Sequence, residues 1–187
     1  GAMIDIGGRS IYLESAGAGD PTVVLVAGGG SSARYWTDDL LQPDAPRQMV
    51  MPAVAEFAHV FAYDRPGTYA FIGDNIFLPR SDAIPQPRTT EDMVAELHAL
   101  LQAAEVPGPY ILVGHSQGGF VSRLYAATYP DEVIGLVLID AYSELIEDVM
   151  PPEKWQALVR LNQEMGSGVV PEIPGYGDAE TTVYGAS

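Results

Sequence analysis

The chain has 187 residues, with 25 acidic against nine basic residues, a formal net charge of −16 and no cysteine. This length is enough for one domain with a hydrophobic core, and no apolar run approaches the roughly 18 residues that a membrane-spanning helix needs. The absence of cysteine excludes disulfides and thiolate chemistry, and the negative charge argues against nucleic acid or an anionic membrane surface as a partner, because both are bound through basic patches.

The amino-terminal part predicts two strands. Residues 1–3 (Gly-Ala-Met) are typical of a cloning remnant and are left out of the predicted fold, and no signal-peptide pattern follows them. We therefore expect a cytoplasmic protein, unless a signal peptide has been removed. Residues 10–15 predict an early strand. Residues 22–27 are mostly β-branched and apolar up to three glycines, a pattern typical of a strand buried on both faces.

The middle of the chain alternates helical and strand patterns. Residues 49–57 predict a helix and residues 60–63 a buried strand, which ends in the turn signal Asp-Arg-Pro-Gly at residues 64–67. Residues 68–88 are rich in proline and aromatic side chains. Excursions of this length in a compact domain are usually functional or mobile.

Regular structure resumes at a strongly capped helix. Thr89 or Thr90 is its N-cap residue, and acidic residues in the first turn favour the positive end of the helix dipole. The elements predicted after this helix are a strand at residues 110–113, a helix at 120–129, a strand at 134–139 and an amphipathic helix at 153–163. Strands that alternate with helices predict a mainly parallel sheet with helices on both faces.

The sequence Gly-His-Ser-Gln-Gly-Gly at residues 114–119 lies directly between a predicted strand and a predicted helix. This context is what turns Gly-x-Ser-x-Gly into a nucleophile elbow, a sharp turn that pushes the serine hydroxyl outward. Side chains at Gly114 and Gly118 would collide with the neighbouring backbone. We therefore interpret Ser116 as a nucleophile; a glycine-rich turn with an incidental serine is the alternative.

Three motifs, each at the end of a predicted buried strand, carry a resemblance to a known family. They are Ala-Gly-Gly-Gly at residues 27–30, Asp-Arg-Pro-Gly at residues 64–67 and the elbow. In this order they resemble the α/β-hydrolase fold family, in its serine esterase and lipase-like form. The resemblance covers residues 4–143 and implies a mostly parallel, doubly wound α/β sheet of eight strands, with a helical cap inserted after the sixth. We expect the core at residues 4–141 and the start of the cap at residues 142–187.

The resemblance also implies an oxyanion hole. One donor is the backbone N–H of Gln117, at the start of the helix that follows the serine. The second donor comes from the glycine run, with Gly29 expected and Gly28 or Gly30 as alternatives. A plain tight turn is the other interpretation of these glycines. A serine in place of an aspartate argues against the epoxide hydrolase and haloalkane dehalogenase branches of the family.

The base that Ser116 needs is not evident among the three histidines. His115 flanks the serine, but side chains beside an elbow point away from the site. His98 lies on the predicted capped helix, and His59 lies just before a strand. The resemblance implies that the acid follows the seventh strand and the catalytic histidine the eighth, both after the cap. No pattern for either strand follows in this sequence.

We therefore interpret the chain as the amino-terminal part of a longer hydrolase, cut within the cap or shortened by deletion, with its own carboxy-terminal segment as the expected partner. Loops rich in glycine and proline, such as residues 166–177, are preferred sites of nicking. Residues 134–139 support this interpretation, because so apolar a strand invites aggregation when it forms a sheet edge. A self-standing, shortened family member is the alternative.

Two aspartates follow predicted strands. Asp140 is an alternative catalytic acid, since some members of the family place the acid after the sixth strand, but a structural aspartate is the simpler interpretation. We expect Asp64 to stabilise the Asp-Arg-Pro-Gly turn, with Arg65 paired to it or to another acid.

An apolar acyl pocket is expected from residues of the loops and the cap, although ordinary packing is the alternative for each of them. The candidates are Trp36, Phe71, Phe77, Met150, Trp155 and Ile173. No metal-ligand spacing is present, and residues 28–30 lack the Lys-Ser/Thr pair of a phosphate loop. We therefore expect no metal and no cofactor.

The main hypothesis is a serine hydrolase that cleaves a carboxylic ester or a related acyl substrate through an acyl-enzyme. A histidine outside this chain takes the proton from Ser116. Thioester, lactone, amide and carbon–carbon bond hydrolysis fit the same residues. Two alternatives remain, namely a ligand-binding or interaction module without a working triad, and a fragment that assembles with its own carboxy-terminal half or with a second copy.

Overall fold

A mixed sheet of six strands forms the centre of the protein. The computed structural model describes residues 1–67, 70–72, 75–84, 88–143 and 145–168. The strands of the main sheet, in spatial order, are β1 (Ala2–Asp5), β2 (Ser10–Ala16), β4 (His59–Tyr63), β3 (Thr22–Val26), β7 (Tyr110–His115) and β8 (Val133–Ile139). The pairs β1–β2 and β2–β4 are antiparallel, and the other three pairs are parallel. The α/β fold expected from the alternating patterns is therefore present.

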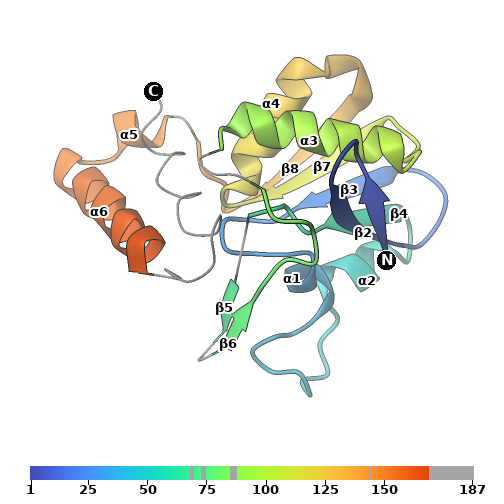
Figure 1. Ribbon diagram of the computed structural model, residues 1–187, viewed down its shortest axis with the longest axis horizontal. Helices are drawn as coiled ribbons and strands as arrows, with labels where there is room; N and C mark the ends of the chain where they lie inside the picture. The colour runs from blue at the N-terminus through green and yellow to red at the C-terminus, as the bar shows by residue number, and fades with distance from the viewer. Residues whose placement is uncertain (68–69, 73–74, 85–87, 144, 169–187) are drawn as a thin grey trace.

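Helices cover both faces of this sheet. They are α1 (Arg34–Thr37), α2 (Val50–Val54), α3 (Thr90–Ala103) and α4 (Gly118–Thr128). Figure 1 shows α3 and α4 on one face and α1 and α2 on the other. The short helices η1 (Pro130–Glu132) and α5 (Ile146–Val149) and the longer α6 (Pro152–Gly168) follow in the chain, and α5 and α6 lie beside the sheet.

Alternating residues of the buried strands divide the core into two layers. On β3, Val24 and Val26 face α3 and α4, whereas Val23 and Leu25 face α1 and α2. All five residues of β3 are buried, as expected for a strand covered on both faces. The side of α3 that carries Leu97 packs into the first layer. The sheet thus depends on both helical layers for its burial.

Several elements differ from the sequence prediction. The helix expected at residues 49–57 is only five residues long, because the chain must turn before His59 pairs with the start of β3. The strand β1 begins at Ala2, so two of the three residues expected as a cloning remnant pair in the sheet. The hairpin of β5 (Ala70–Ile72) and β6 (Asn75–Phe77) was not predicted.

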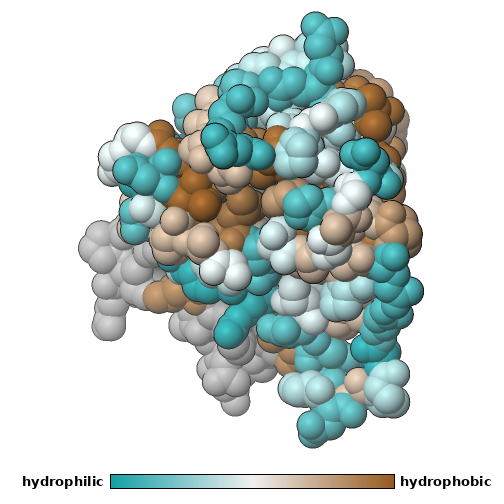
Figure 2. Space-filling view, turned by 90° about the vertical axis from the view of Figure 1, so that its right-hand side faces the viewer, coloured by the Kyte–Doolittle hydropathy of each residue, from teal (hydrophilic) through white to brown (hydrophobic). Residues whose placement is uncertain are grey.

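The edge strand β8 exposes its apolar side chains. Ile134, Leu136, Val137, Leu138 and Ile139 have exposed fractions between 39% and 62%. Apolar residues also reach the surface in patches on the face of the molecule drawn in Figure 2. An exposed apolar edge strand is normally covered or blunted in proteins, because it can pair with another chain. The expectation that this strand forms a sheet edge is met.

The start of α3 is fixed by a capping box. The hydroxyl of Thr89 accepts from the N–H of Asp92 at 3.2 Å, and the Asp92 carboxylate accepts from the N–H of Thr89 at 2.9 Å. We predict that Thr89→Ala lowers the free energy of unfolding by about 1 kcal/mol, measured by urea denaturation.

The matched control is Thr128→Ala, which removes an exposed hydroxyl that bonds only the Leu124 carbonyl within α4. This control is expected to change stability by no more than about 0.5 kcal/mol. Equal losses in the two variants would contradict the assignment of Thr89 as the cap.

Candidate active site

Ser116 lies in a strained turn between β7 and α4. Its φ of +50° is in the left-handed region, which a non-glycine residue rarely adopts. The turn leaves no room for side chains, since a Cβ at Gly118 would overlap the carbonyl oxygen of Val26, and one at Gly114 would lie 2.7 Å from the carbonyl oxygen of Gly118. The Ser116 N–H donates to the carbonyl of Ile139 at 3.1 Å, which ties the turn to the end of β8. This is the geometry of a nucleophile elbow.

The glycine loop after β3 lies against the elbow. A Cβ at Gly28 would come within 3.1 Å of both the Ser116 Cβ and the His115 Nδ1. Within the part of the chain that the structure describes, the backbone N–H groups of Gly29 and Gln117 donate to no other group. Gln117 is also the residue from which α4 begins, where the helix dipole favours negative charge. Two N–H groups are thus available near Ser116 for a developing oxyanion.

A buried arginine joins the two halves of this site. The Arg65 side chain donates from Nη1 to the Ala27 carbonyl at 2.8 Å, and from Nη2 to the Gly28 carbonyl at 2.8 Å and to Gln117 Oε1 at 2.9 Å. Burial lowers the pKa of its guanidinium, while the neighbouring Tyr63 acts in the opposite direction. Arg65 therefore holds the glycine loop in a fixed position relative to the residue that follows the nucleophile.

Asp64 has a partner that the sequence analysis did not name. Asp64 is bound by Arg80, with Nε at 2.7 Å and Nη2 at 2.8 Å, and it accepts from the N–H of Ala33 at 3.0 Å. Asp64 thus stabilises the turn, as expected. The sequence analysis missed the hydrogen bonds from Arg65 to backbone carbonyls, because a carbonyl partner leaves no pattern in a sequence. The one available signal for a buried arginine was its position directly after an apolar strand.

Asp140 lies beside the elbow on the neighbouring strand. The register of β7 and β8 pairs His115 with Ile139, so Ser116 and Asp140 both follow the carboxyl ends of adjacent parallel strands. Asp140 is exposed and has a φ of +43°, a second left-handed non-glycine residue at this edge of the sheet. The prediction that Asp140 follows a strand is consistent with this register.

Two of the three histidines lie away from Ser116. His59 begins β4 and pairs with the start of β3, so it lies where the parallel strands begin. Ser116 follows the end of β7 and lies where these strands finish. His98 lies on α3, where its ring stacks on Tyr129 with centroids 4.0 Å apart and its Nε2 lies 3.1 Å from a carboxylate oxygen of Glu132. Neither histidine is placed to act as the base.

His115 contacts the core rather than the nucleophile. Its ring meets Trp36 edge-on, with centroids 6.3 Å apart. All three histidines of the sequence lie in the described part of the chain, and within that part none is hydrogen-bonded to Ser116. Within the described residues, Ser116 and the nearby N–H groups therefore have no histidine hydrogen-bonded to them.

The residues expected to line an acyl pocket come from several elements of the structure. Trp36 is buried in the core layer under α1 and α2. Trp155 on α6 is half-buried, as is Met150. Phe71 and Phe77 belong to the hairpin of β5 and β6, and Ile173 lies outside the described residues. Trp36 is linked to the elbow through the ring of His115.

The described residues contain no group of three or more His, Asp or Glu side chains that could hold a metal ion. Among the same residues, none of the helices combines the length and the apolar character that crossing a bilayer would require.

Comparisons with known proteins agree with this geometry. A family model described as "Alpha/beta hydrolase family" matches residues 23–186. "Putative carbamate hydrolase RutD" of Cronobacter sakazakii is 32% identical over 127 residues, which are 68% of this chain and 40% of that protein. "Probable transporter efuK" of Hormonema carpetanum is 30% identical over 164 residues, 82% of this chain and 20% of that protein. The chain belongs to the alpha/beta hydrolase family.

Solved structures show the same fold. The epoxide hydrolase CorEH has a TM-score of 0.63 at 25% identity, over 90% of this chain and 50% of that one. A thermophilic esterase from Thermogutta terrifontis has a TM-score of 0.60 at 22% identity, over 88% of this chain and 53% of that one. The chain thus spans about half the length of these structures, and 40% or less of the two curated relatives.

The strain at Ser116 has a measurable cost. Glycine adopts a positive φ without the clash of a Cβ, whereas the left-handed region costs other residues about 1–2 kcal/mol. We predict that Ser116→Gly is more stable than Ser116→Ala by about 1 kcal/mol in chemical denaturation. Both variants lack the hydroxyl, so their difference isolates the backbone. An alanine variant at least as stable as the glycine variant would contradict a strained elbow.

Proposed function

We propose that the protein is a serine hydrolase that cleaves a carboxylic ester or a related acyl substrate. The observation that carries this proposal is the left-handed Ser116 next to Gln117 and close to the glycine loop, where the N–H groups of Gln117 and Gly29 donate to no group among the described residues. The proteins that this chain is similar to include a putative carbamate hydrolase and an esterase, and both activities belong to the same broad class of acyl chemistry.

The proposed reaction has two stages. Ser116 Oγ attacks the substrate carbonyl while a histidine takes its proton, and the carbonyl oxygen becomes an anion held by the N–H groups of Gln117 and Gly29. The bond to the leaving group then breaks, and the histidine returns the proton to the leaving atom. Water, deprotonated by the same histidine, attacks the acyl-enzyme and releases the acid and free Ser116.

The histidine belongs, in this proposal, to a carboxy-terminal segment outside this chain. Three observations support it: the three histidines present contact other groups, the strand β8 exposes its apolar edge, and the chain spans only part of its relatives. The same segment covers β8 and supplies the acid, with Asp140 as the alternative acid. We place the start of the cap at residues 142–187, in which α5 and α6 lie.

A ligand-binding module without a working triad is the second candidate. It is favoured by the absence, within the described residues, of a histidine in contact with Ser116. The two candidates differ in one property, since only a hydrolase activates the serine hydroxyl toward electrophiles.

Labelling with a fluorophosphonate separates the two candidates. We expect the protein that includes its carboxy-terminal segment to gain the mass of one phosphonyl group, because an activated serine displaces fluoride. The adduct should map to the peptide that contains Ser116 and be lost in Ser116→Ala. Intact mass spectrometry under denaturing conditions measures both and reveals whether the segment is a separate polypeptide.

The matched control is Ser122→Ala, which removes a buried hydroxyl on α4, six residues after Ser116. This variant should label at a rate similar to the unchanged protein. No adduct on Ser116 in the complete protein would exclude the hydrolase and favour the binding module.

A further inference from the structure

Arg65 binds the carbonyl ends of the peptide groups whose N–H groups are candidate oxyanion donors. Its Nη2 donates to the Gly28 carbonyl at 2.8 Å, and the N–H of that same peptide group belongs to Gly29. Its Nη1 donates to the Ala27 carbonyl at 2.8 Å, and the N–H of that peptide group belongs to Gly28, the alternative donor. With either glycine as the donor, the arginine lies at the opposite end of the donor's peptide group.

A hydrogen bond to the carbonyl of a peptide group makes its N–H a stronger donor. Gly28 and Gly29 are joined by a trans peptide bond, in which the C=O and the N–H point in opposite directions. A donor on the oxygen and an acceptor at the N–H therefore form one chain of hydrogen bonds, whose members polarise one another. The effect is larger with a guanidinium than with a neutral donor, because it keeps its charge in proteins and makes the stronger hydrogen bonds.

Burial makes this polarisation effective. Arg65 is 2% exposed, and Ala27, whose carbonyl accepts from it, is 4% exposed. Water screens electrostatic interactions little at such positions, so they are stronger than the same contacts at the surface. The charge of Arg65 is therefore felt along the peptide groups that it binds.

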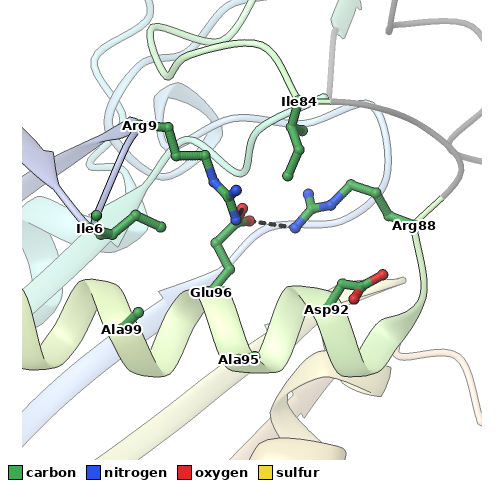
Figure 3. Close-up of a pocket in the computed structure, with 9 residues that line it drawn as sticks. Ile6, Arg9, Ile84, Arg88, Asp92, Ala95, Glu96 and Ala99 are labelled. Atoms are coloured by element: carbon green, nitrogen blue, oxygen red, sulfur yellow. Dashed lines mark hydrogen bonds and ion pairs between the residues drawn. The ribbon is translucent and has the colours of Figure 1, made fainter.

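The turn that carries Arg65 is held from the side of α3. The Nη1 of Arg88 donates to the carbonyl of Pro66, the residue after Arg65, at 2.9 Å. The Nη2 of Arg88 in turn donates to Glu96 at 2.5 Å, and Figure 3 shows Arg88 reaching across to this carboxylate on the helix. Arg88 and Glu96 are both 3% exposed. Arg65 is thus fixed in place before charge develops on the substrate, as a preorganised site requires.

The glycine loop lies close enough to the nucleophile for this charge to act on it. A Cβ at Gly28 would come within 3.1 Å of the Ser116 Cβ. The Nη2 of Arg65 also donates to Gln117 Oε1 at 2.9 Å, and Gln117 carries the other proposed oxyanion donor. One guanidinium therefore contacts both residues that flank the position of the proposed oxyanion.

We propose that the positive charge of Arg65 stabilises the oxyanion through the Gly28–Gly29 peptide group, in addition to fixing the glycine loop. The inference rests on the proposed function, since it concerns the anion formed when Ser116 attacks a carbonyl. Arg65 is a positioning residue in this scheme, because its charge reaches the substrate only through the backbone. A polarised N–H gains most where the carbonyl oxygen becomes negative, so loss of the charge lowers kcat and leaves KM nearly unchanged.

Two substitutions at Arg65 separate charge from geometry. Arg65→Lys keeps a positive charge and Arg65→Gln keeps an N–H donor without one, and both lose the planar fork that reaches three acceptors. In the protein with its carboxy-terminal segment and with p-nitrophenyl acetate as substrate, both variants should lower kcat. We expect kcat of Arg65→Gln to lie at least about tenfold below that of Arg65→Lys, at similar KM. A kcat of Arg65→Lys no higher than that of Arg65→Gln, or a difference carried by KM alone, would overturn the proposal.

A pair of variants at Gln117 decides the question if the Arg65 variants fail to fold. Gln117→Glu keeps an oxygen for Nη2 and neutralises the guanidinium, whereas Gln117→Met removes this hydrogen bond and leaves the charge. If the charge acts, kcat of Gln117→Glu should lie at least about tenfold below that of Gln117→Met. If Arg65 only fixes geometry, the order is reversed, because the carboxylate makes the stronger bond. Equal values or the reversed order would overturn the proposal.

The control Arg47→Gln removes an exposed arginine that pairs with Asp39, and its kcat should stay within about twofold of the unchanged protein. A loss as large as that of Arg65→Gln would reduce the effect to overall charge and overturn the proposal. Absence of turnover by the unchanged protein would overturn the proposed function together with this inference. Turnover by the unchanged protein with the wrong order among the variants would overturn the inference alone.

Discussion

The left-handed backbone of Ser116 is the constraint on which the rest of this site depends. The turn brings the start of α4 so close to the end of β3 that Gly118 lies against the Val26 carbonyl, and only glycine fits there. The same closeness fixes the register in which Val26 pairs with Gly114. The sheet, the helix and the position of the hydroxyl are therefore set by one turn, and the strain in that turn is compensated by the packing around it.

Arg65 extends this constraint to the glycine loop. Its guanidinium binds the carbonyls of Ala27 and Gly28 and the side chain of Gln117, which are the neighbours of both proposed oxyanion donors. Burying a guanidinium is costly on desolvation grounds. Burial of Arg65 therefore lowers the free energy of unfolding, but its hydrogen bonds fix the glycine loop relative to Gln117. Preorganised electrostatic sites require such fixed positions.

Local patterns predicted most of the fold. The buried strands at β3 and β7, the capped helix α3 and the elbow all follow from residues close together in the chain. What could not be predicted depends on partners distant in sequence. Three sets of contacts join segments that come together only in the folded chain. They are the hydrogen bonds of Arg65 to the glycine loop, the ion pair of Asp64 with Arg80, and the ion pairs of Glu96 with Arg9 and Arg88. The strand at Ala2 was missed because its pairing partner, not its own pattern, defines it.

The exposed edge of β8 and the lack, among the described residues, of a histidine in contact with Ser116 both support the proposed carboxy-terminal segment. An uncovered apolar strand needs further protein against it, and an elbow serine needs a histidine. Both needs are met if a carboxy-terminal segment docks on β8 and places its histidine at Ser116. The nucleophile and the oxyanion donors would then belong to this chain and the base to that segment.

The most direct test is the pH dependence of single-turnover acylation of Ser116 by p-nitrophenyl acetate, in the protein with its carboxy-terminal segment and in the 187-residue chain alone. A histidine base acts in its neutral form, so the rate in the complete protein should rise with pH through an inflection near about 6.5. The chain alone should react far more slowly and without that inflection. An equal rate and the same inflection in the chain alone would contradict the account.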